Sequence, residues 1–315
     1  MNTIVLNVES ISKSYGHFQA VKNLSLEVQE GEVFGFLGPN GAGKTTTIQM
    51  LCGLMRPDLG RVLLRGKPVL GGSPEVRAMV GVCPQEIVIW ERLTCLEQLV
   101  FMAEMYGLKP SVARANGLKL LEDLDLAEKA GALARTLSGG MQRRLNIAMA
   151  LVHDPQVVVF DEPEAGLDLQ SRVKVREYIR SLARRKTVIL TTHNMDEADR
   201  VADRVAIIDH GELLVLDTPE RLKQQVGAGD LVEIELKNGA HSEADARGAL
   251  NGMVESVTYD VQNHLLSLRS LNAVGHLAKI LEQLSTAGFE PGNVNLRANT
   301  LEDVFIRLTG RRLRE

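Results

Sequence analysis

The sequence predicts an α/β fold with a mostly parallel sheet, followed by a second, smaller α/β domain. Two observations lead to this prediction. Continuous apolar runs, typical of strands buried on both faces, alternate along the chain with amphipathic stretches. The composition then shifts at Gly-Ala-Gly, residues 227–229, which we interpret as a linker. The 315 residues are enough to build both domains.

Strands are expected where apolar and β-branched residues cluster, at residues 4–11, 18–28, 32–37, 156–163 and 186–193. The last three are almost continuous apolar runs, and the last two each follow a plausible helix. Strands that alternate with helices imply right-handed crossovers, so we expect these strands to pair in parallel.

Residues 94–108 and 111–126 are expected to be helical, because apolar residues such as Leu99 and Ala103 recur there at helical spacing. They belong to a helical insertion at about residues 86–153, outside the sheet.

The main domain is predicted to cover residues 1–228 and the C-terminal domain residues 229–315. In the smaller domain, residues 230–238 alternate like a strand. Residues 273–288 and 300–310 have the pattern of amphipathic helices.

Charge and composition narrow the class of protein. The 36 Lys and Arg against 40 Asp and Glu give a net charge of −4, so no nucleic-acid partner is expected. No apolar window is long enough to span a bilayer, and the first residues do not resemble a secretory signal. Cys52, Cys83 and Cys95 form neither a metal-ligand spacing nor an even disulfide set. We therefore expect a cytosolic, reduced protein that needs a partner for any role at a membrane.

A glycine-rich stretch follows the apolar run at 32–37. Gly38, Gly43, Lys44 and Thr45 fit the pattern G-x-x-x-x-G-K-[ST]. Glycines allow successive backbone N–H groups to approach phosphate oxygens, and the next helix directs its positive end at the same anion. A plain glycine turn is the alternative. The buried strand before the stretch and the helix after it favour phosphate binding.

The apolar run that begins at residue 156 ends in two adjacent carboxylates, Asp161 and Glu162. Consecutive strand residues face opposite sides, so the two are expected to have different roles. Asp161 suits the Mg²⁺ side of a phosphate site, and Glu162 is placed to polarise a water molecule. A solvated acidic turn is the alternative, and the three hydrophobic residues just before the pair favour the functional interpretation.

Ser138, Gly139 and Gly140 precede a helix with an apolar face. Unpaired N–H groups and a serine hydroxyl converge at such a helix start, which predicts a second anion site. Two phosphate-binding elements in one chain make sense if the second serves a nucleotide held by another subunit.

These motifs, in this order, resemble the ATP-binding cassette (ABC) ATPases, the nucleotide-binding subunits of transporters, over residues 4–225. The resemblance implies a P-loop core with a mostly parallel sheet, an antiparallel β subdomain and a helical subdomain. It implies ATP contacts by Tyr15, Gly38, Pro39, Asn40, Gly41, Ala42, Gly43, Lys44, Thr45 and Thr46, with Tyr15 stacked on adenine. Ser138, Gly139, Gly140 and Met141 match the signature, and Asp168 matches the D-loop.

The resemblance also implies roles in catalysis. Glu162 would be the general base, His193 the switch histidine, and Gln85 the residue that links the site to a membrane subunit. Thr45, Gln85 and Asp161 would hold Mg²⁺, so ATP and Mg²⁺ are the expected cofactors. Two cassettes would pair head to tail, with each ATP between the glycine-rich loop of one and the signature of the other.

Three segments, at residues 93–108, 137–145 and 300–313, resemble a bacterial exporter group that includes daunorubicin-type drug-resistance proteins and polysaccharide or lipid exporters. This implies an ATPase that drives export of a drug, lipid or polysaccharide through a separate permease. It implies a homodimer on the cytoplasmic face of the inner membrane, held there by the permease, which would dock near residues 86–122.

Two alternatives stay open. One is a soluble cassette ATPase that acts on the ribosome or on nucleic acid. Such relatives usually carry two cassettes or a long coiled coil, whereas this sequence has one glycine-rich loop, one signature and no sustained heptads. The other is a catalytically silent cassette, because Glu164 stands where the family usually has Thr or Ser. That carboxylate is expected either to disturb the D-loop contact or to point to solvent.

Overall fold

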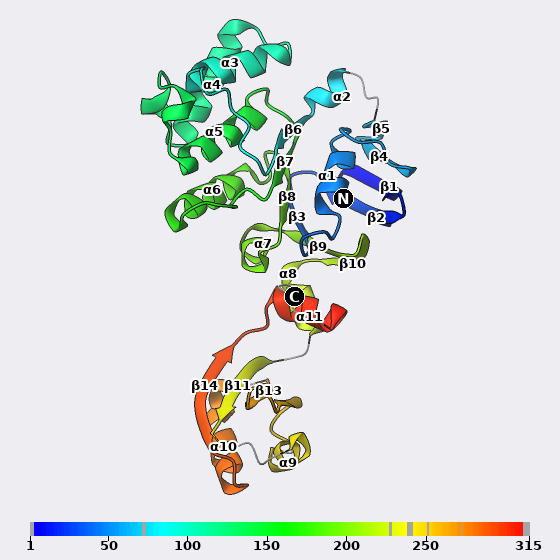
Figure 1. Cartoon of the computed structure of the whole chain (residues 1–315), viewed down its shortest axis with the longest axis vertical. Coiled ribbons are helices and arrows are strands. Elements are labelled where there is room, and N and C mark those ends of the chain that lie inside the picture. Colours follow the sequence, from blue (N-terminus) through cyan, green and yellow to red (C-terminus); the bar gives the residue numbers. More distant parts are fainter. Residues whose placement is uncertain are drawn as a thin grey trace. The chain divides into compact units, whose positions relative to one another are not determined.

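The computed structural model describes residues 3–70, 74–226, 229–237, 242–250, 252–271 and 273–310. The chain divides into two compact units, one ending at Pro219 and the other beginning at Glu220. Both are drawn in Figure 1. The predicted boundary after residue 228 and the linker residues 227 and 228 lie outside the described ranges.

The first unit is built on a six-stranded sheet with the order β10-β9-β3-β8-β7-β6. Its strands are β3 (Val33–Leu37), β6 (Val80–Cys83), β7 (Val157–Asp161), β8 (Thr187–Thr192), β9 (Arg204–Asp209) and β10 (Glu212–Asp217). All pair in parallel except β10, which is antiparallel to β9. The predicted α/β fold with a mostly parallel sheet is therefore confirmed.

The side chains of the central strands alternate between two hydrophobic cores. Phe34, Phe36 and Val159 pack in the core that includes the antiparallel sheet and α1. Phe160 and Leu190 pack in the core that includes the helices. Because both faces are covered, β3 and β7 are buried at every position, which explains their continuous apolar sequences.

The antiparallel sheet has the order β2-β1-β4-β5. It consists of β1 (Ile4–Tyr15), β2 (Phe18–Gln29), β4 (Leu59–Leu64) and β5 (Lys67–Pro68). The β1–β2 hairpin ends at Tyr15 and Phe18, which pair with each other. Helix α1 (Lys44–Leu51) follows β3 and packs in the same core.

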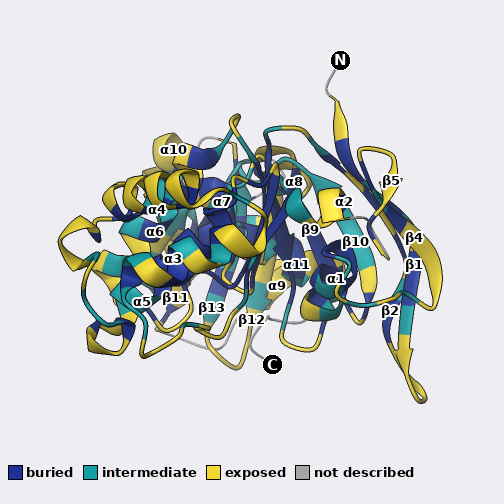
Figure 2. Ribbon diagram, turned by 90° about the horizontal axis from the view of Figure 1, so that it is seen from above, coloured by how far each residue is buried: buried dark blue, intermediate teal, exposed yellow. Residues whose placement is uncertain are grey.

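The remaining helices of this unit are α2 (Pro74–Ala78), α3 (Cys95–Met105), α4 (Pro110–Asp123), α5 (Gly139–Leu151), α6 (Leu169–Leu182) and α7 (Met195–Val201). Short 3₁₀ turns lie at Ala127–Lys129 and Ala134–Thr136. Thr94 and Glu97 form a capping box at the start of α3, and α4 begins at a proline, so both predicted helices of the insertion have physical start signals. Exposed positions lie on the outer turns of α3 and α4 (Figure 2).

The second unit has its own sheet and core. Its elements are α8 (Pro219–Gln225), whose first residue still belongs to the first unit, β11 (Asp230–Leu236), α9 (Glu243–Ala249), β12 (Ser256–Asp260), β13 (Leu265–Ser270), α10 (Ala273–Thr286), β14 (Pro291–Arg297) and α11 (Leu301–Thr309). The sheet order is β12-β13-β11-β14, and every pair is antiparallel. From β11 to β14 the order β-α-β-β-α-β is ferredoxin-like. Apolar residues of both helices and the sheet form a separate core.

Within the described ranges, no helix combines the length and the apolar character that a membrane crossing requires.

Gly81 in β6 allows α5 to pack closely against the sheet. A Cβ at this position would lie 2.0 Å from the carbonyl oxygen of Ala150, and a backbone atom cannot yield as a flexible side chain can. We predict that Gly81→Ala lowers the free energy of unfolding by about 3 kcal/mol, as overpacking does. The control is Gly131→Ala, where a Cβ would meet nothing within 4 Å. Chemical denaturation of both variants measures the difference, and equal stabilities would contradict the prediction.

Candidate functional site

The glycine-rich loop between β3 and α1 is shaped by close backbone contacts. Gly43 has a φ of 98°, and a Cβ there would lie 2.3 Å from the carbonyl oxygen of Ala20. At Gly38 a Cβ would lie 2.4 Å from the carbonyl oxygen of Ile208. Only glycine fits these two positions, so the loop is held against β2 and β9. The first amides of α1 have no carbonyl partner within the helix, which leaves them available to an anion.

Lys44 places a buried cation over this loop. Its Nζ donates to the carbonyl oxygens of Gly38 at 2.7 Å and Pro39 at 3.1 Å. Burial lowers the pKa of Lys44, and the negative charges of Glu162 and Asp161 act against that shift. The ammonium group has few polar partners for a buried charge, so an anionic ligand at the loop would be stabilised by it.

The turn after β7 presents two carboxylates. Asp161 ends the strand and accepts a hydrogen bond from the Thr191 hydroxyl. Glu162 leaves the strand with a φ of 46°, a left-handed conformation that is unfavourable for a non-glycine residue. Its N–H donates to the backbone oxygen and to the hydroxyl of Thr191, both at 3.1 Å. The backbone turn brings both side chains to the carboxyl end of the sheet.

The carboxylate of Glu162 lies at the centre of the candidate site. One oxygen is 3.0 Å from Nδ1 of His193 and 3.9 Å from Nζ of Lys44. The other accepts a hydrogen bond from Nε2 of Gln85 at 3.3 Å. The Glu162 side chain is only 10% exposed, whereas that of His193 is 52% exposed. The three residues expected to be catalytic therefore meet, with the acid inside and the histidine at the surface.

One cavity of about 240 Å³ gathers most of the expected ATP contacts. It is lined by Tyr15, Phe18, Ala20, Pro39, Asn40, Gly41, Gly43, Lys44, Thr45, Thr46, Gln85 and Glu162. Phe18 was not predicted, although an aromatic residue three positions after Tyr15 could have indicated it. The lining combines two aromatic rings with a buried cation and a buried carboxylate, which fits the base and the phosphates of a nucleotide. Among the described residues that line this cavity, none belongs to the signature at 138–141.

The signature lies at the start of α5, outside the lining of this cavity, and Ser138 and Gly139 are exposed there. Ser138 caps this helix, and its hydroxyl accepts from the N–H of Met141 at 3.4 Å. A Cβ on Gly140 would lie 2.3 Å from Oγ of Ser171, so the first turns of α5 and α6 lie side by side. Asp168 caps α6 and accepts from the N–H and the hydroxyl of Ser171, both at 2.9 Å. These hydrogen bonds lower the pKa of Asp168.

The expected metal ligands are few. No group of three or more His, Cys, Asp or Glu side chains in the described part of the chain is arranged to hold a metal ion. Thr45 and Gln85 share the cavity with Glu162, and Asp161 precedes that residue. One or two protein oxygens supplemented by phosphate oxygens and water is the usual way in which Mg²⁺ is bound, so this donor set fits Mg²⁺ on a nucleotide.

Glu164 does not point to solvent. It is buried, and its two carboxylate oxygens accept hydrogen bonds from Nε and Nη2 of Arg176 on α6, at 2.8 and 2.6 Å. Such a bidentate pair fixes both side chains. Glu164 therefore connects the segment after β7 to α6, which is a structural role that the sequence did not predict.

Glu197 on α7 was also missed. Its side chain is buried and accepts a hydrogen bond from the Thr192 hydroxyl at 2.6 Å, and the same hydroxyl accepts from the N–H of Asn194 at 2.9 Å. Burial, followed by the negative charge of Glu164, raises the pKa of Glu197 to about 8. Because Thr192 and Asn194 flank His193, the hydrogen bond between Thr192 and this carboxyl group helps to fix the backbone on either side of the histidine.

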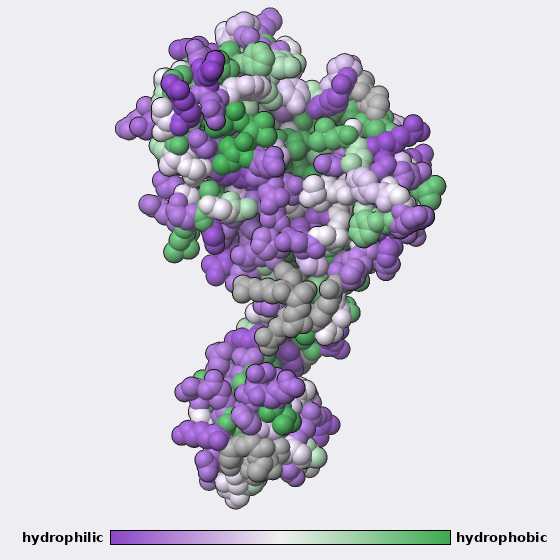
Figure 3. Space-filling model, in the orientation of Figure 1, coloured by the Kyte–Doolittle hydropathy of each residue, from purple (hydrophilic) through white to green (hydrophobic). Residues whose placement is uncertain are grey.

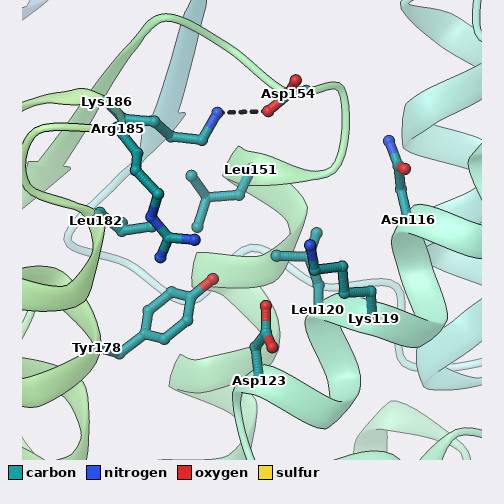
Figure 4. A pocket seen from close by; sticks show the side chains of 10 residues that line it. All are labelled: Asn116, Lys119, Leu120, Asp123, Leu151, Asp154, Tyr178, Leu182, Arg185 and Lys186. Carbon is teal, nitrogen blue, oxygen red and sulfur yellow. Dashed lines mark hydrogen bonds and ion pairs between the residues drawn. The ribbon is translucent and has the colours of Figure 1, made fainter.

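A second cavity, of about 300 Å³, lies between α4, the end of α5 and α6, and contains none of the predicted site residues (Figure 4). Lys119 and Arg185 border it together with the hydroxyl of Tyr178, and Lys186 is paired with Asp154 at 2.6 Å. It shares no lining residue with the cavity of about 240 Å³ around Lys44, which we call the nucleotide cavity.

The family follows from comparison with known proteins. Residues 21–165 match the family described as ABC transporter. A daunorubicin resistance ATP-binding protein, DrrA3 of Streptomyces coeruleorubidus, is 37% identical over 100% of this chain and 99% of its own length. The chain belongs to the ABC transporter ATP-binding proteins. It therefore has the ATP-binding and ATPase function of that family.

Other relatives agree with this assignment. The Nod factor export ATP-binding protein I of Ralstonia nicotianae is 38% identical over 100% of this chain and 96% of its own length. Among solved structures, a dimeric ATP-binding cassette in a post-hydrolysis state with ADP and Pi has a TM-score of 0.62 at 26% identity. That match covers 68% of this chain and 98% of the solved chain.

The raised pKa of Glu197 predicts a pH-dependent stability. Its folded pKa of about 8 lies above the ordinary value of 4.5, so its contribution to stability is full below about pH 4.5, decreases as the pH rises and is lost once the pH passes 8. We predict that, compared with Glu197→Gln, the parent loses up to about 1.4 kcal/mol of unfolding free energy per pH unit between about pH 5 and 8. Denaturation across this range measures the slope. Parallel pH profiles would contradict the prediction, and Glu177→Gln, at an exposed position of α6, is the control.

The Glu164–Arg176 pair makes a prediction about stability rather than catalysis. Glu164→Thr leaves the Arg176 guanidinium, 20% exposed, without its carboxylate partner. We expect a loss of about 2 kcal/mol in unfolding free energy, partly recovered in the double variant Glu164→Thr, Arg176→Met. ATPase turnover should stay within a few-fold of the parent. A large loss of turnover at unchanged stability would show that Glu164 acts on the reaction instead.

Proposed function

We propose that this chain is the ATP-hydrolysing subunit of an export complex, which moves a drug, lipid or polysaccharide through a separate integral-membrane permease. The proposal is carried by the position of the Glu162 carboxylate, held between Lys44, His193 and Gln85 beside the nucleotide cavity. The functions of the relatives, daunorubicin resistance and Nod factor export, support the direction and the class of cargo.

In this proposal the cavity binds ATP through two kinds of contact. The aromatic rings of Tyr15 and Phe18 hold the base by stacking, and the amides of the glycine-rich loop hold the phosphates together with Lys44. Lys44 exchanges its carbonyl partners for phosphate oxygens, which are better partners for a buried cation.

Glu162 would then accept a proton from the attacking water. His193 orients the carboxylate and that water from the exposed side, and Gln85 contacts the second carboxylate oxygen. Bound Mg²⁺, held by Thr45, Gln85 and Asp161, would supply positive charge that stabilises the charge developing on the phosphate oxygens. Thr191 holds Asp161 for this purpose through its hydroxyl.

A second copy of the chain would complete each site. At the exposed turn around Ser138, the first N–H groups of α5 could bind a phosphate. This turn is not among the described residues that line the nucleotide cavity of the same chain. Head-to-tail pairing would place this turn over the nucleotide of the partner, next to Asp168. The dimeric structure of one similar cassette supports such a homodimer.

The permease would dock on an apolar surface beside Gln85. Ile87, Val88, Trp90, Phe101 and Met105 are all at least 40% exposed. Trp90 and Phe101 pack edge to face with ring centroids 5.3 Å apart. Figure 3 shows hydrophobic surface near the positions of α5 and β6 in Figure 1. Exposed apolar patches of this kind usually mark protein contacts. Docking there would hold the chain at the cytoplasmic face of the inner membrane, with Gln85 between the permease and the site.

Isolation of the chain from native membranes in mild detergent tests the partner. We expect a polytopic membrane protein at stoichiometric amounts. Recovery with ribosomes or nucleic acid and without a membrane protein would contradict the exporter function and favour the soluble alternative.

Glu162→Gln tests the catalytic assignment. Gln keeps the shape of the side chain but cannot accept a proton, so we predict a loss of turnover of about 10²- to 10⁴-fold with ATP affinity retained. Steady-state ATPase assays and equilibrium binding of ATP measure the two quantities. The control is Glu122→Gln, at an exposed carboxylate of α4. Turnover within a factor of a few of the parent would remove Glu162 from the role of base.

A further inference from the structure

Arg143 on α5 is an unusual residue because it is a fully buried cation. It is 1% exposed, and among the described residues no carboxylate lies within ion-pair distance of its guanidinium. Burial of a charge is costly unless hydrogen bonds replace the lost water, so the surroundings of Arg143 must compensate for it.

Five backbone carbonyls provide that compensation. Nε donates to Pro163 at 3.0 Å, Nη1 to Pro84 at 2.6 Å and Gln85 at 3.0 Å, and Nη2 to Asp161 at 3.0 Å and Glu162 at 2.8 Å. A guanidinium group has five N–H donors in a planar fork, and here each bond has its own acceptor. No other side chain can make this set of bonds, since Lys offers three donors and Gln two.

These carbonyls belong to the two segments that carry the catalytic side chains. One is the loop after β6, which begins with Pro84 and Gln85, and the other is the end of β7 and the turn after it, with Asp161 and Glu162. Arg143 itself is on the helix that begins at the signature turn, at Ser138. One side chain therefore connects three parts of the site that are distant in the sequence.

The bond to Glu162 has a specific consequence for its strained backbone. The N–H of Glu162 is held by Thr191, and its carbonyl oxygen is held by Arg143. Both polar groups of this peptide segment are thus fixed from opposite sides, which is the condition under which a left-handed non-glycine residue persists.

We propose that Arg143 is a positioning residue for ATP hydrolysis, which fixes Glu162 and Gln85 relative to the signature helix. This rests on the proposed catalytic role of Glu162. Arg143 is not itself among the residues that line the nucleotide cavity, but it binds the backbone carbonyls of Gln85 and Glu162, which are, so it acts through the backbone of the catalytic residues. Any displacement of α5 is transmitted to the carboxylate of Glu162 by the same bonds.

The test compares Arg143→Gln and Arg143→Lys with Arg144→Gln in the full-length chain. Arg144 is the matched control, because it is the next residue of α5 and is also buried, and its partners among the described residues are the carbonyls of Leu124 and Asp125 and the Asp125 carboxylate at 3.8 Å, none of them a predicted site residue. We expect Arg143→Gln to lower kcat about 100-fold with ATP affinity within a few-fold of the parent, since small misplacement of a catalytic group has this effect. Arg143→Lys should recover part of kcat, and Arg144→Gln should lose stability but keep kcat within a few-fold.

A double variant separates positioning from mere stabilisation. If Arg143 acts through Glu162, then Arg143→Gln combined with Glu162→Gln has the turnover of Glu162→Gln alone. Multiplicative losses, or equal loss of kcat in the Arg143 and Arg144 variants, would overturn the inference. A normal kcat in Glu162→Gln would instead contradict the proposed function. If Arg143→Gln does not fold, Arg143→Lys with and without Glu162→Gln gives the same comparison.

Discussion

The backbone turns into the left-handed region at Glu162, immediately after β7, and the polar groups of the site are placed relative to that turn. The turn is held by Thr191 on its N–H side and by Arg143 on its carbonyl side. Its carboxylate then meets Lys44, Gln85 and His193. A normal strand conformation at this position would direct the carboxylate elsewhere, and the three partners would have no common contact.

The parallel sheet brings these partners together. The glycine-rich loop follows β3, Gln85 follows β6, Glu162 follows β7 and His193 follows β8, so all four come from the carboxyl ends of neighbouring parallel strands. Ligand sites in open α/β sheets form at this edge. The two hydrophobic cores on either side of the strands keep the edge rigid, which is what a site with strained backbone requires.

The sequence predicted the parts of the site that depend on local chemistry. Strands such as β7 were visible as apolar runs, and the glycine-rich loop and Ser138 were visible as motifs. The partners that depend on tertiary contact were not visible. Arg143, Glu197 and the pairing of Glu164 with Arg176 involve residues brought together by folding, and a single sequence gives no signal for such pairs.

Two further features were not predicted: the backbone conformation at Glu162 and the strand β14, which contains several polar residues. Alternation along a strand predicts different roles for Asp161 and Glu162, but it could not indicate the positive φ that turns Glu162 inward. In the C-terminal unit, β14 begins with Pro291 and Gly292 and has exposed Asn293 and Asn295 between half-buried neighbours; Pro, Gly and Asn are depleted in strands, so this strand was not predicted. The helices α10 and α11 were predicted because their apolar faces are strongly periodic.

In the proposed function each chain carries the two halves of a nucleotide site on different surfaces, and head-to-tail pairing would unite them. Mixing a Lys44→Ala chain with a Ser138→Arg chain tests this most directly, because one disrupts the glycine-rich loop and the other the signature turn. Pairing predicts that two inactive proteins regain part of the ATPase activity on mixing, since the mixed dimer contains an intact site. Mixing Lys44→Ala with a chain that carries both substitutions should restore nothing. Absence of recovery in the first mixture, with both chains folded, would contradict a site shared between two chains.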